Sequence, residues 1–198
     1  MQNLSYVTLE NLQTVPDAVA GCIYDSWKPT VNMLFDEREA KVAISHLMDK
    51  DKSELARKNV RVMLDGAHVA GVTVAIDMSL LKAARQTNLF CYVSLVKNRP
   101  AFLQKVEEYN ACFAPFSGEG TYLSKFSVTP SYRRKGLGEK LMEYFIGEER
   151  KKGAPAVYLE VHQGNRAAIS LYKKFSFMET GENSAAATYK IMLKKLAY

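Results

Sequence analysis

The chain has 198 residues, which is the length of one domain or of one domain with a small insertion. Hydrophobic residues make up 47% and charged residues 24%, a balance typical of globular proteins that excludes a largely disordered chain. No apolar run reaches the roughly 18 residues that a membrane-spanning helix needs. The first residues lack the basic and apolar regions of a secretory signal, so we expect neither secretion nor a membrane partner.

The net charge of +6 lies entirely in the last two fifths of the chain. Residues 121–198 hold 14 Lys and Arg against seven Asp and Glu, whereas residues 1–120 hold 13 against 14. Such one-sided basic charge suggests an anionic partner: phosphates, nucleic acid or a membrane surface. The alternative is a solvated helix face.

The three cysteines, Cys22, Cys91 and Cys112, are too far apart for a disulfide framework or a metal knuckle. They are typical of buried or free thiols in a reducing cytoplasm, where we expect this protein to be located. The three histidines are equally scattered, so we expect no metal site.

Sequence periodicity predicts the elements of the first half. In chain order they are a strand over 5–10, a helix over 16–27 with Pro16 at its first position, and one or two helices over 36–58. Two β-branched runs within 60–77 then flank Asp65-Gly66, which is a strong hairpin signal. Residues 78–119 are expected to form a partly helical insertion, interrupted around Pro100.

The second half alternates between the strand and helix patterns. The predicted elements are a strand over 121–130, a helix over 137–152, a strand over 156–161, a helix over 165–175, and two strands at 177 and 188–196. Strict alternation in the first of these places Tyr122, Ser124, Phe126 and Val128 on one face. The order predicts a mixed α/β sheet with parallel crossovers.

The loop before the helix at 137 has the composition of an anion site. Arg133, Arg134 and Lys135 supply charge, while Gly136 and Gly138 lack a Cβ and let a ligand approach the backbone. The free N–H groups and the dipole of the helix that follows add positive potential. Together they predict a cradle for a pyrophosphate. The sequence has neither the Walker pattern nor the dinucleotide fingerprint.

Two blocks at the right separation resemble the GNAT superfamily of acyl-CoA-dependent N-acetyltransferases. The first is Arg-Arg-Lys-Gly-Leu-Gly at 133–138, after Val-Thr-Pro at 128–130. The second is Leu-Glu-Val at 159–161, then Asn165, Ala168, Leu171-Tyr172 and Phe177. Ser176 replaces the glycine that the family has before Phe177, which puts the geometry of that turn in question.

The resemblance implies an α/β (α+β) fold in one domain over 1–198, with the insertion at 78–119. Its central sheet would be mixed and mostly antiparallel, flanked by helices, with a splayed parallel pair at 121–128 and 156–161. Acetyl-CoA, as co-substrate, would lie in that gap. The implied cofactor-binding residues are Phe126, Ser127, Val128, Arg133, Arg134, Lys135, Gly136, Leu137, Gly138, Glu139 and Asn165.

The resemblance also implies that Tyr172 protonates the departing thiolate. A tyrosine hydroxyl, with a pKa near 10, can donate a proton at neutral pH. The alternative for Tyr172 is a core residue on an apolar helix stripe. Asn165 has the alternative role of a helix N-cap, which is compatible with cofactor contact through its other amide atom.

A general base must take a proton from the acceptor amine. Glu160 is the first candidate because it points away from Leu159 and Val161, and the ribosomal-protein alanine acetyltransferases of the family look similar at this position. A strand glutamate facing solvent is the alternative. Glu119, His162 or a water held by Ser124 remain open as other bases.

The expected function is direct transfer of acetyl from acetyl-CoA to a primary amine, because no Cys or Ser lies in a nucleophile arrangement. The alternatives are an acyl-CoA-binding relative without catalysis and a basic nucleic-acid-binding module, which lacks any recognised motif. The acceptor is a small-molecule or peptide amine, and a homodimer is compatible with the sequence.

The insertion carries aromatic residues that either line an acceptor pocket or pack onto the sheet, and acids that either attract a cationic amine or face solvent. The aromatic residues are Tyr92, Phe102, Tyr109, Phe113 and Phe116, and the acids are Glu107, Glu108 and Glu119.

Overall fold

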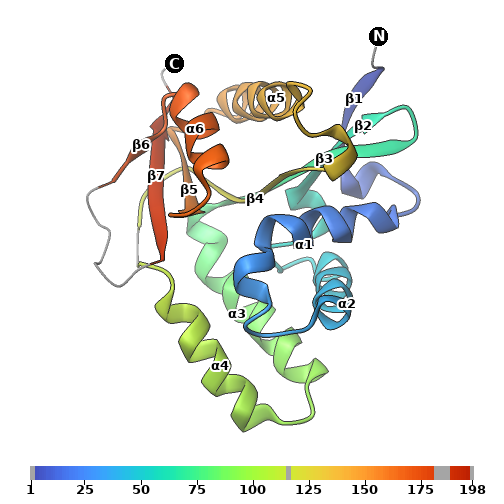
Figure 1. Ribbon diagram of the computed structural model, residues 1–198, viewed down its shortest axis with the longest axis vertical. Coiled ribbons are helices and arrows are strands. Elements are labelled where there is room, and N and C mark those ends of the chain that lie inside the picture. The colour runs from blue at the N-terminus through green and yellow to red at the C-terminus, as the bar shows by residue number, and fades with distance from the viewer. Residues whose placement is uncertain (1–2, 115–116, 181–187, 197–198) are drawn as a thin grey trace.

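The computed structural model describes residues 3–114, 117–180 and 188–196, and within them the chain forms one seven-stranded sheet (Figure 1). Along the sheet the order is β1-β2-β3-β4-β5-β7-β6. The strands are β1 (Leu4–Thr8), β2 (Val60–Asp65), β3 (His68–Asp77), β4 (Thr121–Val128), β5 (Ala156–His162), β6 (Met178–Glu179) and β7 (Tyr189–Lys195). Only the β4–β5 pair is parallel among these strands, which confirms the predicted mixed, mostly antiparallel sheet.

Helices cover both faces of this sheet and extend beyond it (Figure 1). They are α1 (Asp17–Val31), α2 (Glu37–Met48), α3 (Met78–Leu95), α4 (Arg99–Ala111), α5 (Leu137–Lys151) and α6 (Arg166–Lys174). The apolar sides of α1 and α2 pack on one face of the sheet, while those of α5 and α6 pack on the other. The α3–α4 pair projects below the sheet. Of the described helices, none is long and apolar enough to cross a membrane.

The hairpin signal at Asp65-Gly66 is confirmed. β2 and β3 pair antiparallel around this turn, and Gly66 has a φ of +60°, which favours glycine. The helical patterns on either side of Pro100 also correspond to α3 and α4.

Strand β4 contains the feature that shapes the rest of the molecule. Its pairing with β3 shifts between Val74 and Ala75, where Val74 faces Lys125 but Ala75 faces Leu123. Ser124 is therefore the extra residue of a β-bulge, and a bulge bends its strand and increases its twist. The pairing of β4 with β5 covers only residues 121–123, opposite 157–159, so the two strands part beyond Leu123.

The bulge also overturns the predicted alternation of 121–130. Tyr122, Ser124 and Lys125 line one cavity, whereas Phe126 packs in the core on the other face. Ser124 and Phe126 are thus on different faces, because the extra residue shifts the alternation by one.

Two helix predictions in the first half were wrong in extent. The helix predicted within 36–58 ends at Met48, after a capping box at Asp36 and Glu39, and turns follow it. The run from Asp49 to Lys52 is polar and offers no apolar residue to bury. Pro16 is the N-cap of α1 and not its first residue.

The turn after α6 resolves the question that Ser176 raised. The Ser176 N–H donates to the Lys173 carbonyl at 2.9 Å, and the Phe177 N–H donates to the Tyr172 carbonyl at 3.0 Å. These two hydrogen bonds form a Schellman motif, and Ser176 adopts the left-handed φ of +61° that the motif requires. The Phe177 ring packs on Tyr172 with centroids 5.7 Å apart, so the motif helps to fix Tyr172.

We expect Ser176→Gly to stabilise the protein. A left-handed φ costs a residue with a side chain about 1 kcal/mol, which glycine avoids. Thermal unfolding should show a Tm about 2–4 °C higher. Ser45→Gly, inside α2, is the matched control and should lower the Tm. Equal shifts for both variants would contradict the assignment of strain to Ser176.

Candidate active site

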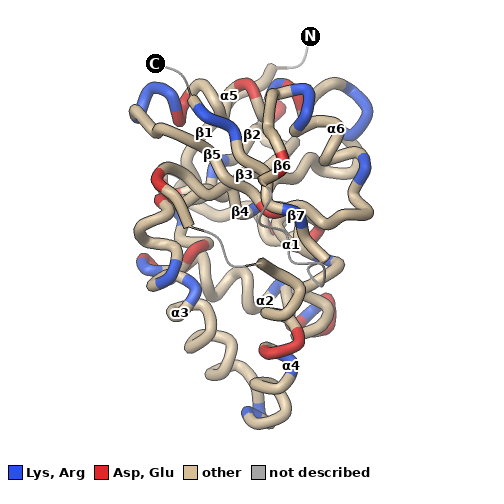
Figure 2. The backbone as a smooth tube through the Cα atoms, turned by 90° about the vertical axis from the view of Figure 1, so that its left-hand side faces the viewer, with Lys and Arg blue, Asp and Glu red and all other residues tan. Residues whose placement is uncertain are grey.

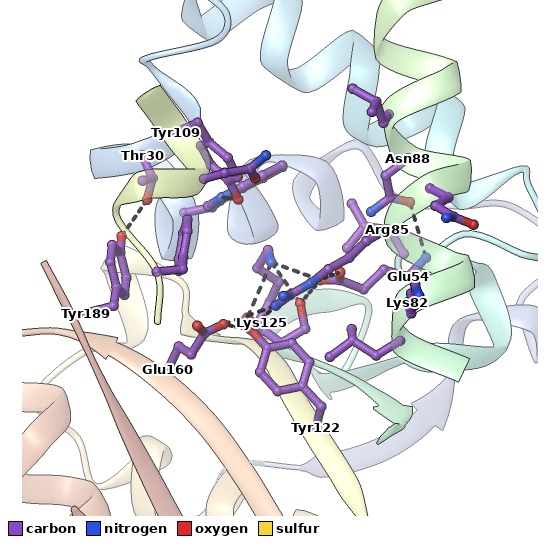
Figure 3. A pocket seen from close by; sticks show the side chains of 18 of the residues that line it. Thr30, Glu54, Lys82, Arg85, Asn88, Tyr109, Tyr122, Lys125, Glu160 and Tyr189 are labelled. Carbon is purple, nitrogen blue, oxygen red and sulfur yellow. Dashed lines mark hydrogen bonds and ion pairs between the residues drawn. The ribbon is translucent and has the colours of Figure 1, made fainter. Parts of the chain in front are cut away.

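A cavity of about 730 Å³ opens where β4 and β5 part. Its floor is formed by β4 and β5, and its walls by α1, α3, α4, the segment before β2, and β7 (Figure 3). A cavity of this size is typical of small-molecule sites.

Glu160 of β5 points into this cavity, away from its apolar neighbours Leu159 and Val161. Its Oε2 accepts hydrogen bonds from the Tyr122 hydroxyl at 2.6 Å and from Arg85 Nη2 at 3.1 Å. Its side chain is only 3% exposed. Its Oε1 is buried and has no hydrogen-bond partner among the described residues. Glu160 is therefore a cavity residue with one acceptor atom still available, and not a solvent-facing strand glutamate.

Glu54 is a second buried carboxylate in the same cavity. Its Oε1 accepts hydrogen bonds from the Ser124 hydroxyl and, at 3.3 Å, from Lys125 Nζ. Arg85 Nε lies 3.9 Å from its Oε2. Arg85 therefore lies between the two carboxylates and has a contact with each (Figure 3).

The two carboxylates have opposite pKa shifts. Burial raises the pKa of Glu160, and the charge of Arg85 only partly offsets this effect. Burial would raise the pKa of Glu54 too, but Lys125 and Arg85 lower it by more, so its pKa falls below its usual value. Glu54 is thus a permanent counter-charge, whereas Glu160 is the carboxylate that can accept a proton. A pair whose environments separate the two pKa values is typical of acid–base sites.

Local hydrogen bonds explain why Glu54 enters the cavity. The side-chain amide of Asn59 donates to the carbonyls of Ser53 and Glu54, at 3.2 and 3.1 Å. The Glu54 N–H donates to Asn88 Oδ1 of α3 at 3.3 Å. These bonds replace helical ones and hold the turn that carries Glu54.

Aromatic rings form one wall of the cavity. The Trp27 indole N–H donates to the Tyr109 hydroxyl at 3.2 Å, and Lys125 Nζ lies 4.7 Å from the Trp27 ring centroid. The Phe113 ring stacks on Tyr189 with centroids 4.7 Å apart. Tyr92, Tyr109 and Phe113 therefore line the cavity, whereas Phe102 packs in the core. Phe116 lies outside the described residues, and Glu107, Glu108 and Glu119 are exposed.

We expect Glu54→Gln to destabilise the fold strongly. It leaves Lys125, which is 10% exposed, without its buried counter-charge, at a cost of about 3 kcal/mol. Differential scanning calorimetry should show a Tm lower by about 6–12 °C. Asp49→Asn removes the exposed partner of Arg57 and should change stability by less than about 1 kcal/mol. Similar losses for both variants would contradict the special role of Glu54.

The cationic loop lies at the start of α5, next to the parted end of β4. Gly136 is the N-cap with a φ of +75°, and no side chain covers it. A Cβ on Gly138 would make only ordinary contacts, at 3.6 Å to Leu171 and 3.9 Å to Val128. Packing therefore does not require glycine at 138, and approach of a ligand to the backbone is a reason for it. The open first turn of α5 fits an anionic group such as a pyrophosphate.

The charges of this loop are partly held by the protein itself. Arg133 donates to the Val128 carbonyl at 2.9 Å and pairs with Asp25 at 3.2 Å. Lys135 donates to the Ser131 carbonyl at 2.9 Å. Arg134 is exposed and has a φ of +59°. Leu137 is buried in the core, so only its backbone is available, and Glu139 pairs with Lys174 at 2.5 Å.

The remaining predicted residues lie on both sides of the gap. Phe126, Ser127 and Val128 pair with β3 along one edge, and their other edge faces the gap. Asn165 is the N-cap of α6, where its Oδ1 accepts from the Ala168 N–H at 3.1 Å, which leaves its amide NH₂ for another partner. Tyr172 is 7% exposed and packs against Phe126 and Phe177. Burial raises the pKa of its hydroxyl.

Of the other base candidates, only Ser124 lines the cavity, where it donates to Glu54. His162 Nδ1 accepts from the Gly164 N–H at 3.0 Å, and its ring packs on Tyr189. Glu119 is exposed outside the cavity.

Comparison with known proteins agrees with this geometry. Residues 90–177 match the sequence model of the acetyltransferase (GNAT) family. An N-acetyltransferase from Staphylococcus aureus Mu50 has the same fold, with a TM-score of 0.64 and 17% identity over 89% of this chain and 93% of that one. The matched segment, less than half of the chain, is therefore similar to the GNAT family.

Curated relatives match only part of this chain. The ribosomal protein bS18 alanine N-acetyltransferase of Escherichia coli K12 is 44% identical over 57 residues, which are 29% of this chain and 38% of that protein. The streptothricin acetyltransferase of Streptomyces lavendulae is 35% identical over 63 residues, 32% of this chain and 33% of that one. The chain therefore spans 38% of the length of its E. coli relative. The PaiA N-acetyltransferase of Thermoplasma acidophilum, solved with coenzyme A, has a TM-score of 0.57 at 17% identity, over 98% of this chain and 99% of that one.

Sequence reasoning missed most of the charged cluster. Arg85, Glu54 and Lys125 carry no motif, and their partners lie 31 to 75 residues away along the chain. The one available signal was Arg85 on a face of α3 that otherwise carries apolar residues such as Leu81 and Tyr92.

Proposed function

We propose that this protein, as one domain, is an N-acetyltransferase of the GNAT family that moves acetyl from acetyl-CoA directly to a primary amine. The observation that carries the proposal is the parting of β4 and β5 between two complementary sites. On one side is the open first turn of α5, and on the other is Glu160 with its unpartnered Oε1. This arrangement suits a ligand that lies through the gap, with its phosphates at α5 and its reactive end at the cavity.

In this proposal the loop at 133–138 and the first turn of α5 hold the pyrophosphate. Backbone N–H groups of α5 donate to the phosphates, and Arg134 and Lys135 add charge. The free edge of Phe126–Val128 offers backbone hydrogen bonds to the amide-bearing arm of the cofactor, and Asn165 offers its remaining amide donors.

Glu160 acts as the general base. Its Oε1 accepts a proton from the acceptor ammonium, while Arg85 and Tyr122 hold Oε2 in place. The neutral amine nitrogen then attacks the thioester carbonyl, the C–N bond forms and the C–S bond breaks, and the second proton of that nitrogen passes to solvent. The raised pKa of Glu160 improves its match to this task.

Tyr172 acts as the general acid and gives its proton to the departing thiolate. It packs with the apolar residues of the α5 face, opposite the face of β5 that carries Glu160. A thioester within the gap is accessible from both faces, which places base and acid on opposite sides of the reacting carbonyl. The raised pKa keeps Tyr172 protonated before the step.

The charge distribution supports a coenzyme more than a nucleic acid. Lys and Arg border α5 and α6 in Figure 2, but many of them pair within the protein. Of the 14 basic residues in 121–198, seven form ion pairs with other described residues, namely Lys125, Arg133, Lys151, Lys152, Lys173, Lys174 and Lys190. The three thiols are free, which supports a cytoplasmic location.

We expect Tyr172→Phe to lower the turnover number by about 10²-fold or more while acetyl-CoA still binds, because only the proton donor is lost. Release of free CoA thiol gives the rate. Acetyl-CoA at 100 times its Kd should raise the Tm of both proteins by about 5–10 °C, and ATP should not. Tyr144→Phe, on α5 where the ring stacks on Tyr6 and lies outside the cavity lining, is the control. Wild-type turnover in Tyr172→Phe would overturn the acid role, and the absence of an acetyl-CoA shift would overturn the function itself.

We expect Glu160→Gln to remove the acidic limb of the pH–rate profile. The base works only when ionised, so the rate falls as the pH drops below its pKa. Because that pKa is raised, the limb should lie above the range of an ordinary glutamate, whose pKa is about 4.3. Glu119→Gln is the control and should keep the wild-type profile. A limb that persists in Glu160→Gln would assign the base to His162 or to a water chain.

A further inference from the structure

The cavity holds a second buried polar atom that the proposed chemistry does not use. The Tyr92 hydroxyl is buried and has no hydrogen-bond partner among the described residues, and Tyr92 itself is 7% exposed. Tyr92 lines the same cavity as Glu160. A buried hydroxyl without a partner costs free energy, which a polar group of a bound ligand would recover.

Tyr92 lies away from Glu160, the proposed base. Arg85, which contacts Glu160, and Tyr92 lie on one face of α3, seven residues and therefore about 10 Å apart along the helix. Tyr92 packs among aromatic rings, with ring centroids 5.4 Å from Phe35 and 6.3 Å from Trp27. The cavity thus has a charged end at Glu160 and an aromatic end at Tyr92.

The charges of the cavity disfavour an acceptor with several amines. Arg85, Lys125 and Lys82 face only two carboxylates, Glu54 and Glu160, among its lining residues. Arg85 and Lys125 already occupy both carboxylates, so additional ammonium groups would meet a net positive wall. The same positive charge favours the neutral form of one amine at Glu160, which is the form that attacks.

Contacts between described residues bridge the side of the cavity near β7. Thr30 of α1 is hydrogen-bonded to the Tyr189 hydroxyl of β7, and Phe113, in the segment after α4, stacks on Tyr189. This contact joins three elements at one wall. A long chain such as a peptide would have to break it to leave the cavity on that side.

We infer that the acceptor is a small aromatic monoamine with a hydrogen-bonding group at the end remote from the amine, which pairs with the Tyr92 hydroxyl. This inference rests on the proposed acetyltransferase function and specifies its substrate class. The amine lies at Glu160, the ring lies along Trp27 and Tyr109, and the remote polar group reaches Tyr92.

The test measures thiol release by the full chain with acetyl-CoA and four amines: tyramine, phenethylamine, spermidine and a hexapeptide with an N-terminal alanine. The Tm shift that each amine causes in the presence of CoA is measured alongside. We expect kcat/KM for the two aromatic monoamines to exceed the other values by tenfold or more. Preference for spermidine or the peptide, or no response to either aromatic amine, would overturn the inference. An acetyl-CoA shift that persists in that case would leave the acetyl-CoA site intact, so the two failures are distinguishable.

Tyr92→Phe tests the hydroxyl itself. We expect the KM for tyramine to rise by about threefold to tenfold with kcat retained, while phenethylamine, which lacks the phenol group, keeps its KM. The free variant should unfold about 2–4 °C higher, because a buried hydroxyl without a partner is removed. Tyr144→Phe should change none of these values. Equal KM changes for the two amines, or a lower Tm, would overturn the role of Tyr92.

Discussion

The bulge at Ser124 is the constraint on which the candidate site depends. It bends β4 away from β5 after only three paired residues, so the sheet opens in its interior and not at an edge. The shift in alternation sends Ser124 and Lys125 to the same face as Tyr122. A regular β4 would close the gap, and it would turn Lys125 towards the apolar core under α5.

The second feature of the candidate site is its charged cluster, formed by Glu54, Arg85, Lys125 and Glu160. Two buried carboxylates meet the buried Lys125 and the partly exposed Arg85 at the gap, and each carboxylate has a cation within 3.3 Å. Arg85 contacts both carboxylates, so the ionisation of one affects the other through a shared partner. Lys125 and Arg85 lower the pKa of Glu54 and keep it ionised, whereas burial raises the pKa of Glu160. The cluster therefore combines stability with a group that is able to change its charge.

The sequence predicted the features of the fold and the site that depend on residues close together along the chain. The hairpin at Gly66, the loop at 133–138, the N-cap at Asn165 and the inward side of Glu160 each follow from a few adjacent residues. The bulge was missed because Ser124 carries no glycine or proline signal, and strict alternation was the simpler pattern. Glu54 and Arg85 were missed because their partners come from strands far along the chain. The roles of Tyr172 and Glu160 remain predictions, since proximity to the gap does not test chemistry.

Much of the cavity wall comes from a single stretch of sequence, α3 and α4 between β3 and β4, whereas the cationic loop at 133–138 follows β4. Substitutions in this stretch can therefore change the proposed acceptor site and leave the proposed cofactor site unchanged. Arg85 is the exception, because it lies within this stretch and contacts two carboxylates outside it. A related protein with a different helix pair would need to supply a cation at the same place or lose both acids together. Divergence of acceptor preference in this lineage should accordingly be rapid at Tyr92 and slow at Arg85.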